Sequence, residues 1–101
     1  MFFKVQHEPL ANGLLAVLGA EGTQTLLALA TYIDKDGKCY PTQDQLAELV
    51  GVSRTTLNKR INALCDVQYE GEYVVLKEQV RYKGNFSNNV YTVNPRILSI
   101  F

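Results

Sequence analysis

Residues 53–65 carry side chains whose types and spacing suit contact with a nucleic-acid duplex. Arginine can donate to the two acceptors of guanine, asparagine can pair with adenine, and threonine offers a hydroxyl and a methyl group. Arg54, Thr55 and Asn58 supply these groups within little more than one helical turn. No carboxylate occurs in the stretch. Because an acid would repel phosphate, this composition favours a surface that approaches a polyanion.

A helix over this stretch would separate its polar side chains from an apolar face. At about 100° per residue, placing Leu57 inward puts Ile61 and Leu64 beside it. The side chains that then point outward, at the centre or on the flanks, are Arg54, Thr55, Thr56, Asn58, Lys59 and Asn62. The alternative interpretation is an ordinary solvated helix face.

Phosphate contacts are expected from Lys59 and from the hydroxyls of Ser53 and Thr42. Such contacts position a protein on DNA without selecting a sequence. The residues predicted to bind DNA on these helices are therefore Thr42, Ser53, Arg54, Thr55, Thr56, Asn58, Lys59 and Asn62.

Two short helices and a tight turn would hold these side chains in place. The first is expected over 43–50 with Thr42 as its cap, and the second over about 53–65 with Ser53 as its cap. Ala47 is small enough for a close helix contact, Gly51 tolerates a positive φ in the turn, and Leu57 anchors the second helix. This spacing indicates a helix-turn-helix, and an ordinary helical hairpin is the alternative.

The rest of the chain predicts an α+β fold, mostly α. We expect an extended segment at 2–5, a helix that has Pro9 in its first turn and ends at Gly19, and a buried helix over 23–33. A turn at 34–37 and an extended segment at 39–41 follow. Strands over 73–76, 79–82 and 90–93 form a C-terminal β-hairpin, with residues 83–89 as its tip.

This hairpin, residues 72–95, adds a second set of candidate DNA contacts. Arg81, Lys83, Asn85 and Asn88 are polar or positively charged residues at or beside its expected tip. Their side chains could contact phosphate groups or the neighbouring minor groove. Of the four, we include Arg81, Lys83 and Asn85 in the predicted DNA-binding site. A polar turn with no binding role is the alternative.

Length and composition bound the remaining possibilities. A chain of 101 residues with 47% hydrophobic content is one small folded domain. Its 10 basic and 10 acidic residues cancel, but residues 1–50 carry three bases against six acids and residues 51–101 carry seven against four. A polyanionic partner should therefore meet the second half.

Neither an enzyme nor a membrane protein is indicated. His7 is the only histidine, and Cys39 and Cys65 are too few for a zinc site, so we expect reduced thiols and no catalytic residue, metal or cofactor. No apolar run approaches the roughly 20 residues of a membrane span, and no signal peptide opens the chain. We expect a cytoplasmic protein.

Several segments together resemble the winged helix-turn-helix class of DNA-binding domains common in bacterial, plasmid and phage proteins. They are Asp34-Lys35-Asp36-Gly37, Cys39-Tyr40-Pro41-Thr42-Gln43, Leu46-Ala47 and Gly51-Val52-Ser53-Arg54-Thr55-Thr56-Leu57. The opening Phe2-Phe3-Lys4-Val5 and the helix after it are similar to the N-terminal domains of replication initiators and of DnaD-like replisome organisers. The resemblance divides the single domain, 1–101, into an N-terminal extension (1–20), a helical core (21–65) and a wing (72–95).

The resemblance implies binding of double-stranded DNA with the second motif helix in the major groove. It also implies homodimers whose N-terminal elements make the contacts between subunits, and a role in replication initiation beside other replication proteins. Relatives in replication are usually longer, and the apolar residues 97–101 make an unusual tail, so we expect the N-terminal domain of a longer protein. The alternatives are a transcriptional regulator, and a winged helix used only for oligomerisation or protein interaction.

Overall fold

More of the described residues lie in helices than in strands. The computed structural model describes residues 2–82 and 86–100, with the backbone path alone at 80–82 and 86–88. The helices in this part are α1 (His7–Ala11), α2 (Leu14–Ala30), α3 (Gln43–Val50) and α4 (Arg54–Cys65). None of these described helices has the length and apolar character needed to cross a bilayer.

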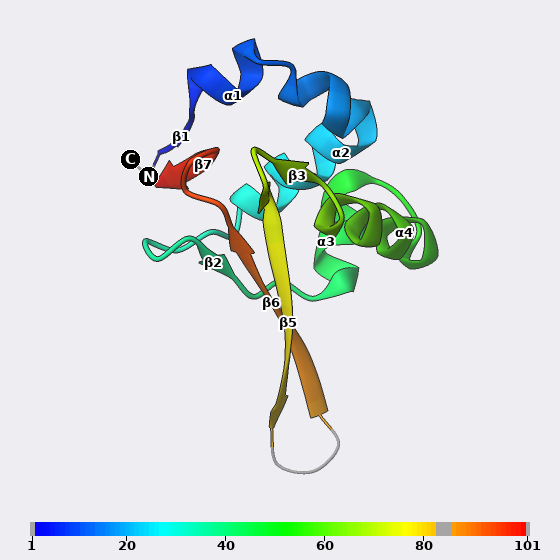
Figure 1. The fold of residues 1–101 in the computed structure, drawn as a ribbon. Coiled ribbons are helices and arrows are strands. Elements are labelled where there is room, and N and C mark those ends of the chain that lie inside the picture. Colours follow the sequence, from blue (N-terminus) through cyan, green and yellow to red (C-terminus); the bar gives the residue numbers. More distant parts are fainter. Residues whose placement is uncertain (1, 83–85, 101) are drawn as a thin grey trace.

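The strands pair antiparallel in small sheets. The sheet next to the helices has the order β2 (Lys38–Cys39), β6 (Phe86–Val93), β5 (Val75–Tyr82). The first and last strands, β1 (Phe3–Val5) and β7 (Leu98–Ile100), pair with each other, and β3 (Gln68–Tyr69) pairs with β4 (Glu72–Tyr73). Figure 1 shows the β5–β6 hairpin extending away from the helices, while β1 and β7 lie beside α1.

The core lies where α2, α3 and α4 meet the base of the β5–β6 hairpin. Its fully buried side chains include Leu29, Leu46, Leu57, Ile61, Leu64, Val74, Val75, Tyr91 and Val93. Three packed helices followed by a projecting hairpin are the architecture of a winged helix-turn-helix, so the predicted α+β fold class is confirmed.

The N-terminal helices differ from the sequence prediction. We expected a helix that ends at Gly19 and a separate one over 23–33. The break at Gly19 is confirmed, because Gly19 has non-helical angles (φ 69°, ψ 178°) and α2, which runs from Leu14 to Ala30, consists of two helical segments that meet there. The differences are that α1 ends at Ala11, that a turn at Asn12 and Gly13 (φ 98°) divides the first expected helix, and that the second ends at Ala30. An Asn-Gly pair is a strong turn signal that the prediction overlooked. The positive φ at Gly19 bends the helical path, which resumes in the following residues.

The hairpin also differs from the prediction. β5 is one continuous strand, and β6 begins at Phe86, so residues 86–89 lie in a strand rather than in the tip. The expected strand at 73–76 is divided between β4 and β5, and β3–β4 is a separate short hairpin that the sequence did not predict. Its turn has positive φ at both Glu70 (52°) and Gly71 (81°).

The apolar C-terminal residues have a structural role in this fold. Ile97 and Leu98 are fully buried, and β7 pairs with β1 in the register Phe3 opposite Ile100. The amide of Gln6 also donates to the Ile97 carbonyl over 2.8 Å. Their hydrophobic character, taken from the sequence as an unusual tail, is therefore explained by the core; Phe101 lies outside the described residues.

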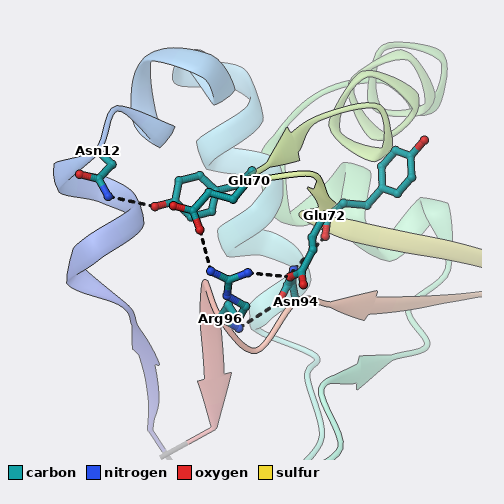
Figure 2. Close-up of polar contacts among 7 residues, drawn as sticks. Asn12, Glu70, Glu72, Asn94 and Arg96 are labelled. Carbon is teal, nitrogen blue, oxygen red and sulfur yellow. Dashed lines mark hydrogen bonds and ion pairs between the residues drawn. The ribbon is translucent and has the colours of Figure 1, made fainter.

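A polar cluster joins the β3–β4 hairpin to the turn before β7, as Figure 2 shows. Arg96 Nη2 donates to Glu70 Oε2 over 2.7 Å, and Arg96 Nη1 lies 3.3 Å from Glu72 Oε2. The Asn94 amide donates to the same Glu72 oxygen over 3.0 Å. This hydrogen bond, together with the Arg96 charge, lowers the pKa of Glu72, and the bond to Glu70 raises the pKa of Arg96.

Both cysteines are free thiols, as predicted. Cys39 is fully buried, and its Sγ donates to the Tyr91 carbonyl over 3.5 Å. Burial, with a smaller contribution from the Asp34 charge, raises the pKa of Cys39 to about 12. Because the thiolate is the nucleophilic form, Cys39 is a structural thiol.

Candidate nucleic-acid interface

Local interactions define the start of α3 and the turn that follows it. The Thr42 hydroxyl accepts from the Gln45 amide over 3.0 Å, and Gln45 Oε1 accepts from the Thr42 amide over 2.8 Å, which is a reciprocal capping box. At the other end Gly51 has φ 80° and ψ 32°, and the Gly51 and Val52 amides both donate to the Ala47 carbonyl. The predicted helix bounds and turn are confirmed.

Apolar packing fixes α4 against α3 and α2. Leu46 and Leu57 are fully buried on the facing sides of α3 and α4, and Ala47 is buried beside them. Further along α4, Ile61 and Leu64 are buried in the same core. Because buried side chains in close-packed cores occupy defined positions, the outward face of α4 is presented in one orientation.

The predicted site residues on these helices all lie on the surface. The exposed ones are Thr42, Ser53, Arg54, Thr55, Thr56, Asn58, Lys59 and Asn62. Within the described part of the chain, the side chains of Thr55 and Lys59 have no hydrogen-bond or ion-pair partner. The structure thus brings these residues to the start and the outward face of one helix, with Thr42 at the start of its neighbour.

The two capping hydroxyls are already engaged. Ser53 Oγ accepts from the Thr56 amide over 3.1 Å and donates to Thr56 Oγ1 over 3.0 Å. The Thr42 hydroxyl accepts within the capping box described above. Both residues therefore have a structural role as caps, whatever else they contact.

Gln43, at the first position of α3, connects two of the predicted residues. Its Oε1 accepts from Arg54 Nε over 3.2 Å, and its Nε2 donates to Asn58 Oδ1 over 3.0 Å. Sequence reasoning missed Gln43, because the pattern of α4 alone does not reveal which α3 side chain lies across from it. Its position directly after the predicted cap was the only available signal.

A carboxylate also lies at this edge of the interface. Arg54 Nη1 is 3.8 Å from Asp44 Oδ1, and both side chains are more than half exposed. Exposed ion pairs of this kind contribute little to stability. The pair nevertheless holds Arg54 toward α3.

Arg60 belongs to the core side of α4 rather than to its outward face. Its side chain is only 17% exposed, Nη1 donates to Gln24 Oε1 over 3.0 Å, and Nη2 lies 3.6 Å from Glu21 Oε1. Arg60 therefore ties α4 to α2, and its positive charge is partly neutralised there.

The hairpin contributes a cation that sequence reasoning missed. Lys77 Nζ on β5 donates to Asn62 Oδ1 over 3.4 Å, so the base of the wing reaches the outward face of α4. The strand register decides which β5 side chains face α4, and the sequence did not fix that register. Of the predicted wing residues, Arg81 lies in β5 with only its backbone described, and Lys83 and Asn85 lie outside the described residues.

The fold and this geometry are those of a winged helix-turn-helix. Comparison with protein families agrees, because residues 23–69 match a family model described as a helix-turn-helix domain. The match spans α3, the turn and α4 together with residues 23–30, the C-terminal part of α2. Comparison with curated proteins and with solved structures gave no match.

Proposed function

We propose that this chain is a non-enzymatic protein that binds double-stranded DNA, with α4 in the major groove and the wing against the adjacent backbone. The observation that carries the proposal is the rigidly packed α4, which turns an acid-free polar face to solvent. An α-helix fits the major groove of B-DNA, where base edges present their distinguishing donors and acceptors. Motifs of this geometry place the second helix there.

Charge supports the same surface. Arg54 and Lys59 are exposed on α4, and Lys77 of β5 donates to Asn62 of the same helix, although the chain as a whole has a net charge of zero. Contacts to phosphate supply most of the affinity of such interfaces and make it dependent on salt. A local positive surface on a neutral protein is sufficient for that dependence.

Salt titration of duplex binding tests the proposal. We expect the logarithm of the association constant to fall linearly with the logarithm of salt concentration, by about 0.9 for each phosphate neutralised. The measurement is fluorescence anisotropy with duplexes selected by the protein from a random pool. Absence of duplex binding at low salt would contradict the proposal.

We propose that the chain binds DNA during replication initiation. The resemblance of the N-terminal segment to replication initiators supports this role. A transcriptional regulator would use the same α4 surface on an operator. Mapping the selected sites distinguishes the two, since repeated sites at an origin support initiation and single or paired sites at promoters support regulation.

We also propose a homodimer formed through the N-terminal part, and the exposed apolar residues there support it. On α2, Leu15, Val17 and Leu27 are 47%, 62% and 43% exposed. Sedimentation equilibrium of wild type should then give twice the mass of one chain. Leu27→Glu should shift the equilibrium to monomer, whereas Leu49→Glu, at a similarly exposed leucine on α3, should not.

The same exposed apolar residues favour a second candidate function, a module used only for oligomerisation or protein interaction. That function predicts self-association without duplex binding at any salt concentration. Measuring both properties on one preparation separates the two candidates.

A further inference from the structure

The hydrogen bonds around Gln43 have only one possible direction. An arginine side chain donates hydrogen bonds and cannot accept them. Because Arg54 Nε lies 3.2 Å from the Gln43 amide, the atom facing it must be the oxygen Oε1. The Gln43 nitrogen Nε2 therefore faces Asn58, and the Asn58 atom that accepts from it at 3.0 Å must be Oδ1. One arginine thus fixes the orientation of two amides that could otherwise rotate.

From this chain of hydrogen bonds we propose that Gln43 is a positioning residue that makes Asn58 a hydrogen-bond donor toward DNA, selecting a base with a keto group. The inference rests on the proposed function. One acceptor site of Asn58 Oδ1 is occupied by Gln43, while no acceptor in the described residues faces Asn58 Nδ2. The group left to meet a base edge is therefore chiefly the N–H₂ of Asn58.

The chemistry of the major groove converts this orientation into a preference. Guanine and thymine present the keto oxygens O6 and O4, which accept hydrogen bonds, whereas adenine and cytosine present amino groups, which donate. A donor side chain directed at this keto or amino position, rather than at the N7 acceptor that guanine and adenine share, favours the first pair and meets another donor in the second. We expect guanine or thymine at the base that Asn58 contacts, preferred about five- to a hundredfold over adenine or cytosine.

Replacing Gln43 by glutamate should invert that preference. The carboxylate introduced by Gln43→Glu would still accept from Arg54 but could only accept from Asn58, so the Asn58 amide would turn its N–H₂ toward α3 and present Oδ1 to the base. Glutamate is well tolerated in the first turn of a helix, where it complements the helix dipole. The change should leave the fold intact.

Gln45→Glu is the matched control. It adds the same charge to the same helical turn, and glutamate preserves the acceptor that the capping box requires at this position. Gln45 makes no hydrogen bond to Asn58 or Arg54 in the described structure. Any general repulsion of DNA by the added charge therefore affects both variants alike.

The experiment selects duplexes from a randomised pool with the full chain and its variants. Asn58→Ala first identifies the base pair whose discrimination depends on Asn58. The proposal is supported if wild type and Gln45→Glu prefer guanine or thymine there and Gln43→Glu prefers adenine or cytosine. A Gln43→Glu profile equal to that of Gln45→Glu overturns it, as does a wild-type preference for adenine or cytosine, or an unchanged profile in Asn58→Ala.

Two further measurements keep the test decisive. If circular dichroism shows Gln43→Glu to be unfolded, Gln43→Leu replaces it, and a loss of discrimination at the same base pair then supports the proposal, while full retention overturns it. If wild type binds no duplex, the proposed function is wrong, and this inference is then wrong as well. If wild type binds and discriminates but the Gln43 variants do not differ from their control, only the role of Gln43 fails.

Discussion

Arg54 forms an ion pair with Asp44, in which Nη1 lies 3.8 Å from the carboxylate oxygen Oδ1. The pair joins the first turn of α4 to the first turn of α3, on the surface that we propose for DNA. A carboxylate there opposes phosphate and also holds an arginine that DNA would otherwise attract. Asp44 should therefore weaken DNA binding in the natural protein.

Asp44→Asn should bind duplex DNA more tightly, by about three- to tenfold at low salt, because one opposing charge is removed and Arg54 is released. Stability should fall by no more than about 1 kcal/mol, the contribution of an acid in the first turn of a helix. Anisotropy titration and urea unfolding measure the two effects. Glu48→Gln, which removes an exposed charge near the other end of α3, is the control, and an equal gain in that variant would contradict the prediction.

Arg54 and Lys59 should differ in how their loss affects binding. Arg54→Ala should weaken binding to the preferred duplex by about 1–3 kcal/mol and relax discrimination, as expected of a base contact. Lys59→Ala should weaken all duplexes alike and reduce the salt slope by about 1, as expected of a phosphate contact. Lys35→Ala, in the turn at 34–37, removes a distant charge and should change neither quantity. Small and equal effects in the two α4 variants would refute the assigned roles.

Gly51→Ala should destabilise the fold by about 1–2 kcal/mol, because an alanine in the left-handed region brings Cβ too close to the following carbonyl oxygen. A Cβ at Gly51 meets no other atom within 4 Å, so the loss comes from the backbone conformation, φ 80°, alone. Asparagine tolerates this conformation better, and Gly51→Asn should lose less. Urea unfolding of both variants tests the prediction, and an Asn variant less stable than the Ala variant would contradict it.

The polar cluster at Arg96 should make stability depend on pH. The pKa of Glu72 is lowered in the folded protein from its ordinary value of 4.5, chiefly by the Asn94 hydrogen bond. Its stabilising contribution is therefore complete above that ordinary value, and is lost as pH falls through the lowered value. Urea midpoints of wild type and Glu72→Gln should differ at pH 7 and approach each other as the pH falls below the ordinary value and through the lowered one, and a constant difference would exclude this role.

The sequence was most informative where local chemistry decides the structure. The start of α3 follows from Thr42, the turn from Gly51 and the start of α4 from Ser53, each of which acts on its immediate neighbours in the sequence. Caps and positive φ angles are properties of short segments. They could therefore be predicted without knowing the tertiary fold.

The features that could not be predicted depend on contacts between distant segments. Gln43 connects to Asn58 only because α3 and α4 cross at a particular rotation, and Lys77 reaches Asn62 only in the observed register of β5. Likewise, Ile97 is buried because β7 returns to β1 from the other end of the chain. These contacts therefore cannot be predicted from the residue types alone.

The pairing of β1 with β7 makes the two ends of the fold a single cooperative unit. Each strand obtains its ladder hydrogen bonds from the other, so neither can separate from the domain while its partner stays protected. Amide hydrogen exchange should therefore give Lys4 and Ser99, which face each other in this ladder, a common opening free energy. Truncating one end would expose the amides of the opposite end to solvent, although almost the whole sequence separates them.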